Sequence, residues 1–559
     1  MVVEDGSGKM ASGLRERVRI PVMVGATLLY GILVAVAVLR VWRHYELIAI
    51  FLQAVLLLPA FLYGLKGSGP ALPSLPVPAR PRFWIAVAMG AFLIGSAALS
   101  AIVTQGSEAD EVAYLFQART LSTGHLVAPP PPGAPELPWN QPLALTFNHS
   151  VLWRKGWSMK YPLGWPLAMA LPAKFGWAWA LNPLLGVGIL IFTARLARRL
   201  GGEEGAFLAV ALLVLSPCFL ARSVVLMAHP LEGLLVAGAC WAWYEATCRR
   251  SLPRFALMYL LIGLGFHVRP LTALMTAVAL TASAVWTLRR ERAFLIRVLA
   301  TGTAFGALTA GSVLWYNWIL TGSPWHSPYS FYRNLRVPIE VSASVPQMFR
   351  NMKDMWRTSA QSTLLYFFPL GFLLAGIGFW KNRRSFPLVW PLASLLVALV
   401  LGHLVQTEPS GSSVGERYWY EAYFGVAILA ALGIAAVASA LQSSRRALVA
   451  AGCALLAVQV TMTIVGGRAL WQRSAPAYAM GHLAAQYRDC HCVVFLGSSP
   501  PVFYGKHLNL NGPDWAHANV FYAVDPGPGQ RMAWARTLGR ERWVVLGYDP
   551  SRGVAREER

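Results

Sequence analysis

Long apolar runs, separated by short polar segments, dominate the chain as far as about residue 466. A run of about 18 or more apolar residues can cross the hydrocarbon core of a bilayer as a helix. The pattern therefore predicts about 13 spanning helices, near residues 20–40, 46–65, 83–103, 177–197, 204–221, 229–247, 255–266, 270–288, 296–316, 362–380, 386–405, 421–441 and 447–466. The short run at 255–266 leaves open a half-helix that meets the next helix at 267–270.

Composition and charge agree with a polytopic α-helical membrane protein. Hydrophobic residues make up 56% of the chain and charged residues only 13%, whereas a soluble globular protein is about 25% charged. Most of the net charge of +23 lies in short loops between the apolar runs, so it indicates topology rather than nucleic-acid binding. The positive-inside rule places the N-terminus in the cytoplasm, with Arg40 and Arg43 as the exception.

The loop lengths divide the chain into three regions. Residues 1–82 form a cytoplasmic tail, two extra spans and a linker, and residues 83–466 form the main transmembrane domain. Its first long outer loop is 104–176. Residues 467–559 form an extracytoplasmic tail, in which the strand-like runs 492–496 and 543–546 predict a small α/β domain. Cys490 and Cys492 resemble half of a zinc site, but without a second pair a structural or incidental role is the simpler interpretation.

The first outer loop carries the chain's most distinctive polar residues. Asp110 and Glu111 directly follow a predicted span, at the start of a segment that reads as a short interfacial helix. Acids there can simply cap the helix, since its dipole favours negative charge. A carboxylate at the membrane surface could also act as a base on a lipid-anchored substrate. Lys160 precedes a short apolar helix, where it can snorkel or bind a phosphate.

Further polar residues are predicted at the outer face. His229 and Glu232 are three residues apart and share a helix face, as a local pair or as functional groups. Arg269 could cap a broken helix or bind a phosphate, and the phosphate is favoured. Arg417 and Tyr420 lie in an aromatic segment that suits either an interfacial belt or contact with sugar and lipid. His149 and Arg154 add possible donors, and Arg222 a further cation.

Several motifs in this order resemble the GT-C glycosyltransferases, the group that includes protein O-mannosyltransferases, aminoarabinose transferases and bacterial lipopolysaccharide or arabinan transferases. The resemblance covers about residues 100–430. It rests on the Asp110-Glu111 pair followed by YLFQARTLSTGHL, on Lys160-Tyr161-Pro162-Leu163, and on the segments NPLLGVGILIFTARLARRLGG, LSPCFLARSVVLMAHPLEG, GLGFHVRPLTAL, YNWILTGSPWHSPY and GERYWYEAYFGVAILAALG. The chain departs from the family's Lys-Pro-Pro pattern at Tyr161.

The resemblance implies a GT-C fold and inverting transfer of a sugar from a polyprenyl phosphate to an extracytoplasmic acceptor, a glycolipid, polysaccharide or protein. Asp110 would be the catalytic base, and Glu111 would support it or help to hold a divalent metal, with His229 as a possible third ligand. The substrate-binding residues would be Lys160, Tyr161, His149, His229, Glu232, Arg269, Arg417 and Tyr420. The expected location is a bacterial inner membrane, with the C-terminus outside.

Two other classes of function compete with this one. A transporter or flippase of lipid-linked sugars would also need many spans and polar groups within the membrane. It would be expected to show paired, broken helices with binding groups near the midplane. The sequence has no evident internal repeat, and its acids cluster in an outer loop. A catalytically silent scaffold in envelope assembly is the third possibility, against which the intact Asp110-Glu111 pair argues.

Overall fold

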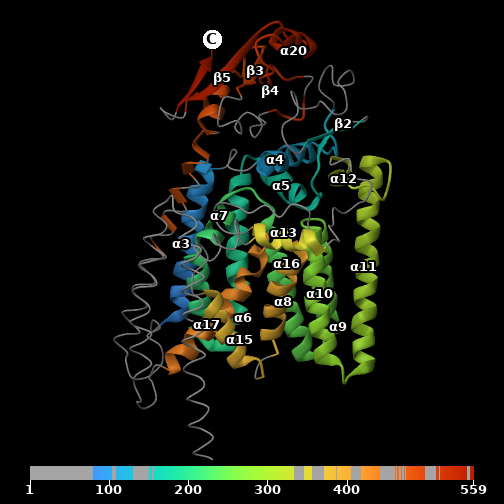
Figure 1. The fold of residues 1–559 in the computed structure, drawn as a ribbon, viewed down its shortest axis with the longest axis vertical. Coiled ribbons are helices and arrows are strands. Elements are labelled where there is room, and N and C mark those ends of the chain that lie inside the picture. The colour runs from blue at the N-terminus through green and yellow to red at the C-terminus, as the bar shows by residue number, and fades with distance from the viewer. Residues whose placement is uncertain are drawn as a thin grey trace, which may run out of the picture. The chain divides into compact units, whose positions relative to one another are not determined.

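The computed structural model describes residues 80–103, 109–129, 150–153, 156–332, 345–355, 371–384, 387–404 and 417–440, and, with short gaps, 460–497, 511–549 and 554–558. Helices dominate as far as residue 440 (Figure 1). They are α3 (Pro81–Val103), α4 (Ala109–Ser122), α5 (Gly164–Lys174), α6 (Ala178–Val214), α7 (Pro217–Val224), α8 (His229–Arg249), α9 (Leu252–Phe266), α10 (Pro270–Leu288), α11 (Arg292–Thr321), α12 (Pro328–Tyr332), α13 (Val345–Met355), α15 (Gly371–Asn382), α16 (Val389–Leu404), the 3-10 turn η3 (Tyr420–Ala422) and α17 (Tyr423–Ala440).

Within the described residues, five helices are long and apolar enough to cross a membrane, namely α3, α6, α10, α11 and the run Tyr420–Ser439. A sixth is possible if α7 and α8, bent by 117°, count as one broken span. The expected spans 20–40 and 46–65, and most of 447–466, lie outside the described residues. The prediction of an α-helical membrane protein is thus confirmed in kind, while the count of about 13 spans stays a prediction.

Of two expected boundaries in this region, one agrees with the structure and one differs. The predicted span 177–197 and the first part of 204–221 lie in α6, whose backbone is non-helical at Gly201 and Gly202, so two helices meet at a kink between the predicted spans. Gly202 has a φ of 64°, a conformation that glycine adopts without steric cost. The helix then ends at Val214, and α7 starts anew after Ser216, whose hydroxyl accepts a hydrogen bond from the Phe219 N–H. A predicted apolar run therefore contains a helix break.

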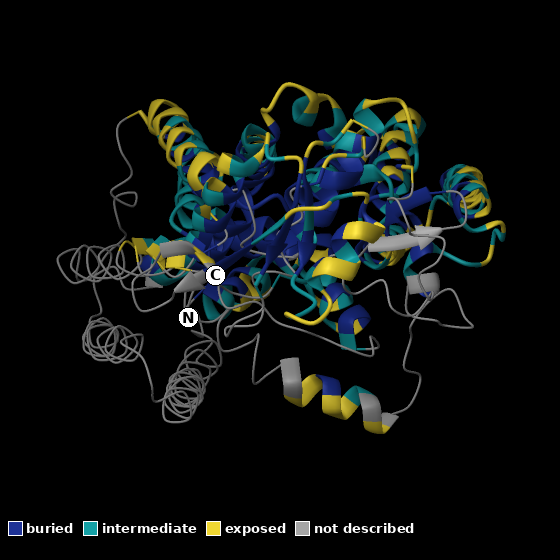
Figure 2. Ribbon diagram, turned by 90° about the horizontal axis from the view of Figure 1, so that it is seen from above, coloured by how far each residue is buried: buried dark blue, intermediate teal, exposed yellow. Residues whose placement is uncertain are grey.

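The short run at 255–266 becomes α9, which packs alongside α8, α10 and α11 (Figure 1). Burial is uneven among the helices. In an apolar 18-residue stretch of the span that starts at Tyr420, 72% of the residues are buried, whereas only 6% are buried in the corresponding stretch of α11. Figure 2 shows the same contrast between buried central and exposed outer segments. Outer helices expose large apolar side chains such as Ile94, Leu308 and Trp318, as expected where lipid is the solvent.

The tail contains a four-stranded sheet in the order β4-β3-β5-β6. Its strands are β3 (Val493–Leu496), β4 (Phe521–Val524), β5 (Trp543–Asp549) and β6 (Val554–Glu558), accompanied by the 3-10 turn η4 (Ala485–Tyr487) and helix α20 (Arg531–Thr537). β3 is parallel to both β4 and β5, and β6 is antiparallel to β5. Both strand-like runs of the sequence are thus strands. Cys490 and Cys492 form a disulfide, so their sulfurs bond to each other rather than forming half of a zinc site.

The central strand β3 is buried on both faces, as strands with parallel neighbours usually are. Successive side chains of a strand alternate between faces. Val494 and Leu496 pack against the segment before β3, in a cluster that includes Met480 and Ala484. Val493 and Phe495 face the other way, into a second core, whose partners are Ala113 and Phe116 of α4, Trp157 and Met159 of β2 (Gly156–Met159), and Ala535 and Leu538 from α20 and its end. The tail therefore shares a core with the helix that carries Asp110.

Candidate active site

Helix α4 presents its two acids in its first turn, where the helix dipole favours negative charge. They point to different partners. Asp110 lies with its Oδ2 3.4 Å from Nη1 of Arg417, and its side chain is 19% exposed. Glu111 is buried, and its Oε2 accepts a hydrogen bond of 3.0 Å from the Leu226 N–H. Asp110 therefore remains accessible, while Glu111 binds α4 to the bend between α7 and α8.

That bend, residues 225–228, is irregular backbone inside the helical bundle, where unsatisfied polar groups are costly. Buried side chains satisfy its carbonyl groups. Trp165 donates to the Leu226 carbonyl at 3.0 Å, and Asn182 donates to the Met227 carbonyl at 3.0 Å and also to that of Val225. Together with the bond from Leu226 to Glu111, these contacts fix the bend. The bend in turn sets the position of His229, the first residue of α8.

A buried ionic cluster follows directly. His229 Nδ1 lies 3.1 Å from Oε1 of Glu421, and Arg269 bonds to both of these side chains. Arg269 occupies the N-cap position of α10, and Glu421 lies in η3. A buried carboxylate requires a paired cation to stay charged, and Arg269 supplies that cation. Arg222 is also buried, and its charge lies near His229.

Glu232 faces elsewhere, although it shares the first turn of α8 with His229. Its side chain is buried against Gly265, where an added Cβ would approach Oε1 to 2.8 Å. Among the described residues, its Oε2 has no hydrogen-bond partner. Of the two alternatives for His229 and Glu232, the local pair is therefore not formed, because His229 contacts Glu421 and Arg269.

The tyrosines of the segment at 417–420 have separate surroundings. The Tyr418 ring has the guanidinium of Arg417 at 5.2 Å and that of Arg269 at 5.7 Å from its centroid. Tyr420 is 2% exposed and stacks on Phe219 at 5.7 Å. The bundle encloses this ring, and contact of Tyr420 with sugar or lipid stays a prediction. Tyr418, which the sequence did not single out, is the tyrosine whose ring lies near both arginines.

Lys160 directly follows β2, whose partner in an antiparallel pair is β1 (Ser150–Trp153). Its side chain is 5% exposed, and its ammonium lies 5.2 Å from the ring centroid of Tyr161 and 5.0 Å from that of Tyr329. Gln117 ties this strand to α4, because its Oε1 accepts from the Met159 N–H at 3.0 Å. The helix that carries Asp110 thus also positions Lys160.

The Tyr161 ring packs on that of Tyr114, one turn after Asp110 on α4, at a centroid distance of 4.4 Å. Burial raises the pKa of Tyr161 well above its usual range, and the charge of Asp110 and a hydrogen bond with that carboxylate raise it further. Burial, followed by the charge of Asp110, likewise raises the pKa of Tyr114. Both hydroxyls therefore stay protonated at physiological pH.

The structure brings together most of the predicted residues. Asp110, Tyr161 and Arg417 form one group, and His229, Arg269 and Glu421 form another. The Tyr418 ring lies near the arginine of each group. His149 and Arg154 lie outside the described residues. Glu421 was quoted in a sequence motif without a role. Its pairing with Arg269, 152 residues away, could not be inferred from local pattern.

The proposed metal ligands are not assembled. Among the described residues, no group of three or more His, Cys, Asp or Glu side chains could hold a metal ion. Asp110 faces Arg417, Glu111 accepts from a backbone N–H, and His229 contacts Glu421 and Arg269. A metal would have to compete with these cations and donors, so the present arrangement of Asp110, Glu111 and His229 does not fit one.

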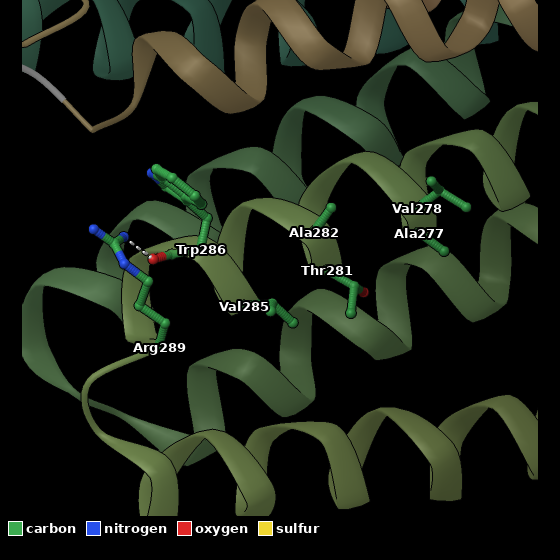
Figure 3. A pocket seen from close by; sticks show the side chains of 7 residues that line it. All are labelled: Ala277, Val278, Thr281, Ala282, Val285, Trp286 and Arg289. Atoms are coloured by element: carbon green, nitrogen blue, oxygen red, sulfur yellow. Dashed lines mark hydrogen bonds between the residues drawn. The ribbon is translucent and has the colours of Figure 1, made fainter.

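A separate pocket of about 580 Å³ lies beside the C-terminal half of α10 (Figure 3). Most of its lining is apolar, with Trp286 and Arg289 at one end. Arg289 donates to the Trp286 carbonyl at 2.5 Å. Arg269 lies at the opposite end of the same helix. This pocket contains none of the candidate active-site residues.

Comparison with known proteins gives one family match. Residues 167–316 match the family described as dolichyl-phosphate-mannose-protein mannosyltransferase. The predicted resemblance to GT-C glycosyltransferases is confirmed. The matched segment runs from α5 into α11 and contains His229, Glu232 and Arg269, but not Asp110, Lys160 or Arg417. No curated protein sequence matches the chain.

Solved structures give distant matches. ArnT from Cupriavidus metallidurans in the apo state is 12% identical, with a TM-score of 0.48, over 84% of this chain and 94% of that chain. The same protein bound to undecaprenyl phosphate is 11% identical, with a TM-score of 0.45, over 85% and 94%. The oligosaccharyltransferase of Archaeoglobus fulgidus with Zn and sulfate is 14% identical, with a TM-score of 0.41, over 82% and 68%. With TM-scores below 0.5, these likenesses assign no chemistry to this chain.

Proposed function

We propose that the chain is an inverting membrane glycosyltransferase, which moves a sugar from a polyprenyl phosphate to a hydroxyl of a glycolipid, polysaccharide or protein. The observation that carries the proposal is the partly exposed carboxylate of Asp110 beside Arg417, next to the buried cluster around Arg269. Dolichyl phosphate, named in the matched family, is itself a polyprenyl phosphate. We place the enzyme in a bacterial plasma membrane with this site on the extracytoplasmic side.

In the proposed reaction, the acceptor hydroxyl gives its proton to the Asp110 carboxylate. The acceptor oxygen forms a bond to the anomeric carbon of the sugar. The bond between that carbon and the phosphate oxygen breaks, and its electron pair leaves with the polyprenyl phosphate. Attack from the face opposite the phosphate inverts the anomeric configuration. Every proton and electron pair is accounted for without a metal or a further reactant.

The cations fit this scheme because a phosphate is a good leaving group and needs charge stabilisation rather than a strong acid. Arg417 and Arg269 share the Tyr418 ring, and Lys160 lies beside Tyr161, which bonds to Asp110. A donor phosphate in this region would be held near the base by cations from three separate segments. Such positioning lowers the entropic cost of bringing donor and acceptor together.

The test is a transfer assay on the purified protein in proteoliposomes, with a panel of undecaprenyl-phosphate sugars and an extracted envelope fraction as acceptor. Asp110→Asn should lower the transfer rate by about 10²–10⁴-fold, the usual contribution of a general base. Asp489→Asn, an exposed aspartate of the tail, is the matched control and should leave the rate unchanged. Full activity in purified Asp110→Asn would rule out the base, whereas donor movement across the bilayer without transfer would favour a flippase.

A further inference from the structure

Tyr161 occupies the position at which this chain departs from the Lys-Pro-Pro pattern, and its ring lies against the helix of the proposed base. The ring packs on Tyr114 at 4.4 Å, with 37° between the two planes. Tyr114 is four residues after Asp110 on α4, so the two side chains lie on the same face of the helix. This contact holds the Tyr161 hydroxyl beside Asp110.

The direction of the hydrogen bond between them is fixed by protonation. The Tyr161 hydroxyl keeps its proton, for the reasons given above, and an ionised carboxylate can only accept. Tyr161 therefore donates to Asp110. Proline has no donor to offer at this position.

Asp110 is thus held by two donors from different parts of the chain. Arg417 lies 3.4 Å from Oδ2, and Tyr161 donates from the segment that follows β2. In the part of the chain that the structure describes, Arg269, Tyr114 and Tyr418 also lie near Asp110, and Lys160 lies beside the Tyr161 ring. Two donors in fixed positions restrict rotation of a carboxylate, so the directions of its lone pairs are defined.

We propose that Tyr161 is a positioning residue, whose hydroxyl orients the Asp110 carboxylate toward the acceptor hydroxyl. This inference rests on the proposed function, because it concerns the base of that reaction. It separates two adjacent residues by role: Lys160 contributes to holding the donor phosphate, whereas Tyr161 acts on the base. Loss of the Lys160 ammonium should weaken donor binding, whereas loss of the Tyr161 hydroxyl should slow sugar transfer in the enzyme–substrate complex.

The experiment compares Tyr161→Phe with Lys160→Ala in the transfer assay. Tyr161→Phe keeps the ring and its packing on Tyr114, so kcat should fall about tenfold while the donor KM stays within about twofold. Lys160→Ala should raise the donor KM at least tenfold. The matched control is Tyr487→Phe, which removes a tyrosine–carboxylate hydrogen bond of 2.7 Å to Glu557 in the tail and should change neither constant.

Each kcat is normalised to the fraction of protein that binds undecaprenyl phosphate, so that loss of folded protein is not counted as loss of rate. An unchanged kcat in Tyr161→Phe would overturn the inference and leave the proposed function intact. A raised donor KM with normal kcat would also overturn it, because Tyr161 would then belong to the donor site. A wild-type protein that transfers no sugar from any donor would remove both the function and the inference.

Discussion

The carboxylate of Glu111 accepts a hydrogen bond from the backbone N–H of Leu226, which lies 115 residues further along the chain. The neighbouring Asp110 faces Arg417 instead. Two adjacent acids thus have different tasks. Glu111 completes the hydrogen bonding of a bend inside the bundle, while Asp110 stays accessible beside the cations. The pair that the sequence presents as one unit is divided by the fold.

We therefore predict that Glu111→Ala destabilises the protein, whereas Glu111→Gln is tolerated. Alanine leaves the buried Leu226 N–H without an acceptor, which costs about 1–3 kcal/mol. Glutamine keeps an acceptor oxygen at the same reach. Thermal unfolding in detergent checks the difference, and the transfer rate of Glu111→Gln should stay within about tenfold of wild type. Complete loss of transfer in a normally stable Glu111→Gln protein would instead show that the Glu111 carboxylate takes part in catalysis.

The contrast between these acids also shows what could be predicted from sequence. Helices such as α8 and α10 were placed within a few residues, because their apolar runs are local signals. The break after Val214 was missed, since it lies within an apolar run. The partners of Glu111 and Glu421 lie more than 100 residues away. Such contacts depend on how the helices pack, which no short motif records.

A second prediction concerns the crossing of α15 and α17. An added Cβ at Gly378 would lie 1.9 Å from the Leu429 carbonyl oxygen, which cannot move aside as a flexible side chain could. Small residues allow such close approach of helices in membranes. Gly378→Ala should therefore lower the unfolding temperature and the yield of folded protein. Gly376→Ala is the matched control on the same helix, because nothing lies within 4 Å of a Cβ there.

In Gly376→Ala, the better helix propensity of alanine should leave stability unchanged or raise it by up to about 1 kcal/mol. Unfolding followed by tryptophan fluorescence compares the two variants. Equal midpoints for both variants would show that α15 and α17 do not approach as closely as described.

The tail should lose stability in acid. Arg531 donates two hydrogen bonds to Asp525, of 2.9 and 2.7 Å, and the pKa of Asp525 is lowered chiefly by these bonds. Because the pKa of Asp525 is lower in the folded protein than in the unfolded chain, its ion pair stabilises the fold fully at a pH above the unfolded pKa of about 4. This stabilisation is lost as the pH falls through the lowered folded value. Asp525→Asn should therefore make proteases cleave the tail faster at pH 7.

At a pH below the lowered pKa of Asp525, wild type and Asp525→Asn should be cleaved at similar rates, because both side chains are then neutral. Limited proteolysis across a pH series, followed by detection of the tail fragment, measures this. If the two proteins differ equally at pH 7 and in strong acid, the ion pair is not the source of the difference.

The final prediction separates structural from substrate-binding roles of Arg269. The Glu421 side chain is fully buried, and Arg269 is its paired cation. Arg269→Ala should therefore destabilise the protein by about 3–5 kcal/mol, because it removes the paired cation of a buried carboxylate. Adding Glu421→Gln removes the carboxylate charge, so the double variant should regain part of the lost stability.

The matched control is Arg250→Ala, whose partner Glu291 is exposed, so its removal should change stability little. Both Arg269 variants should bind undecaprenyl phosphate more weakly than wild type, since each lacks the same cation. Unfolding midpoints and undecaprenyl-phosphate binding, measured on the same preparations, distinguish a structural role of Arg269 from a role in donor binding. If the double variant recovers both stability and binding, Arg269 serves only to neutralise Glu421 and has no contact with the donor.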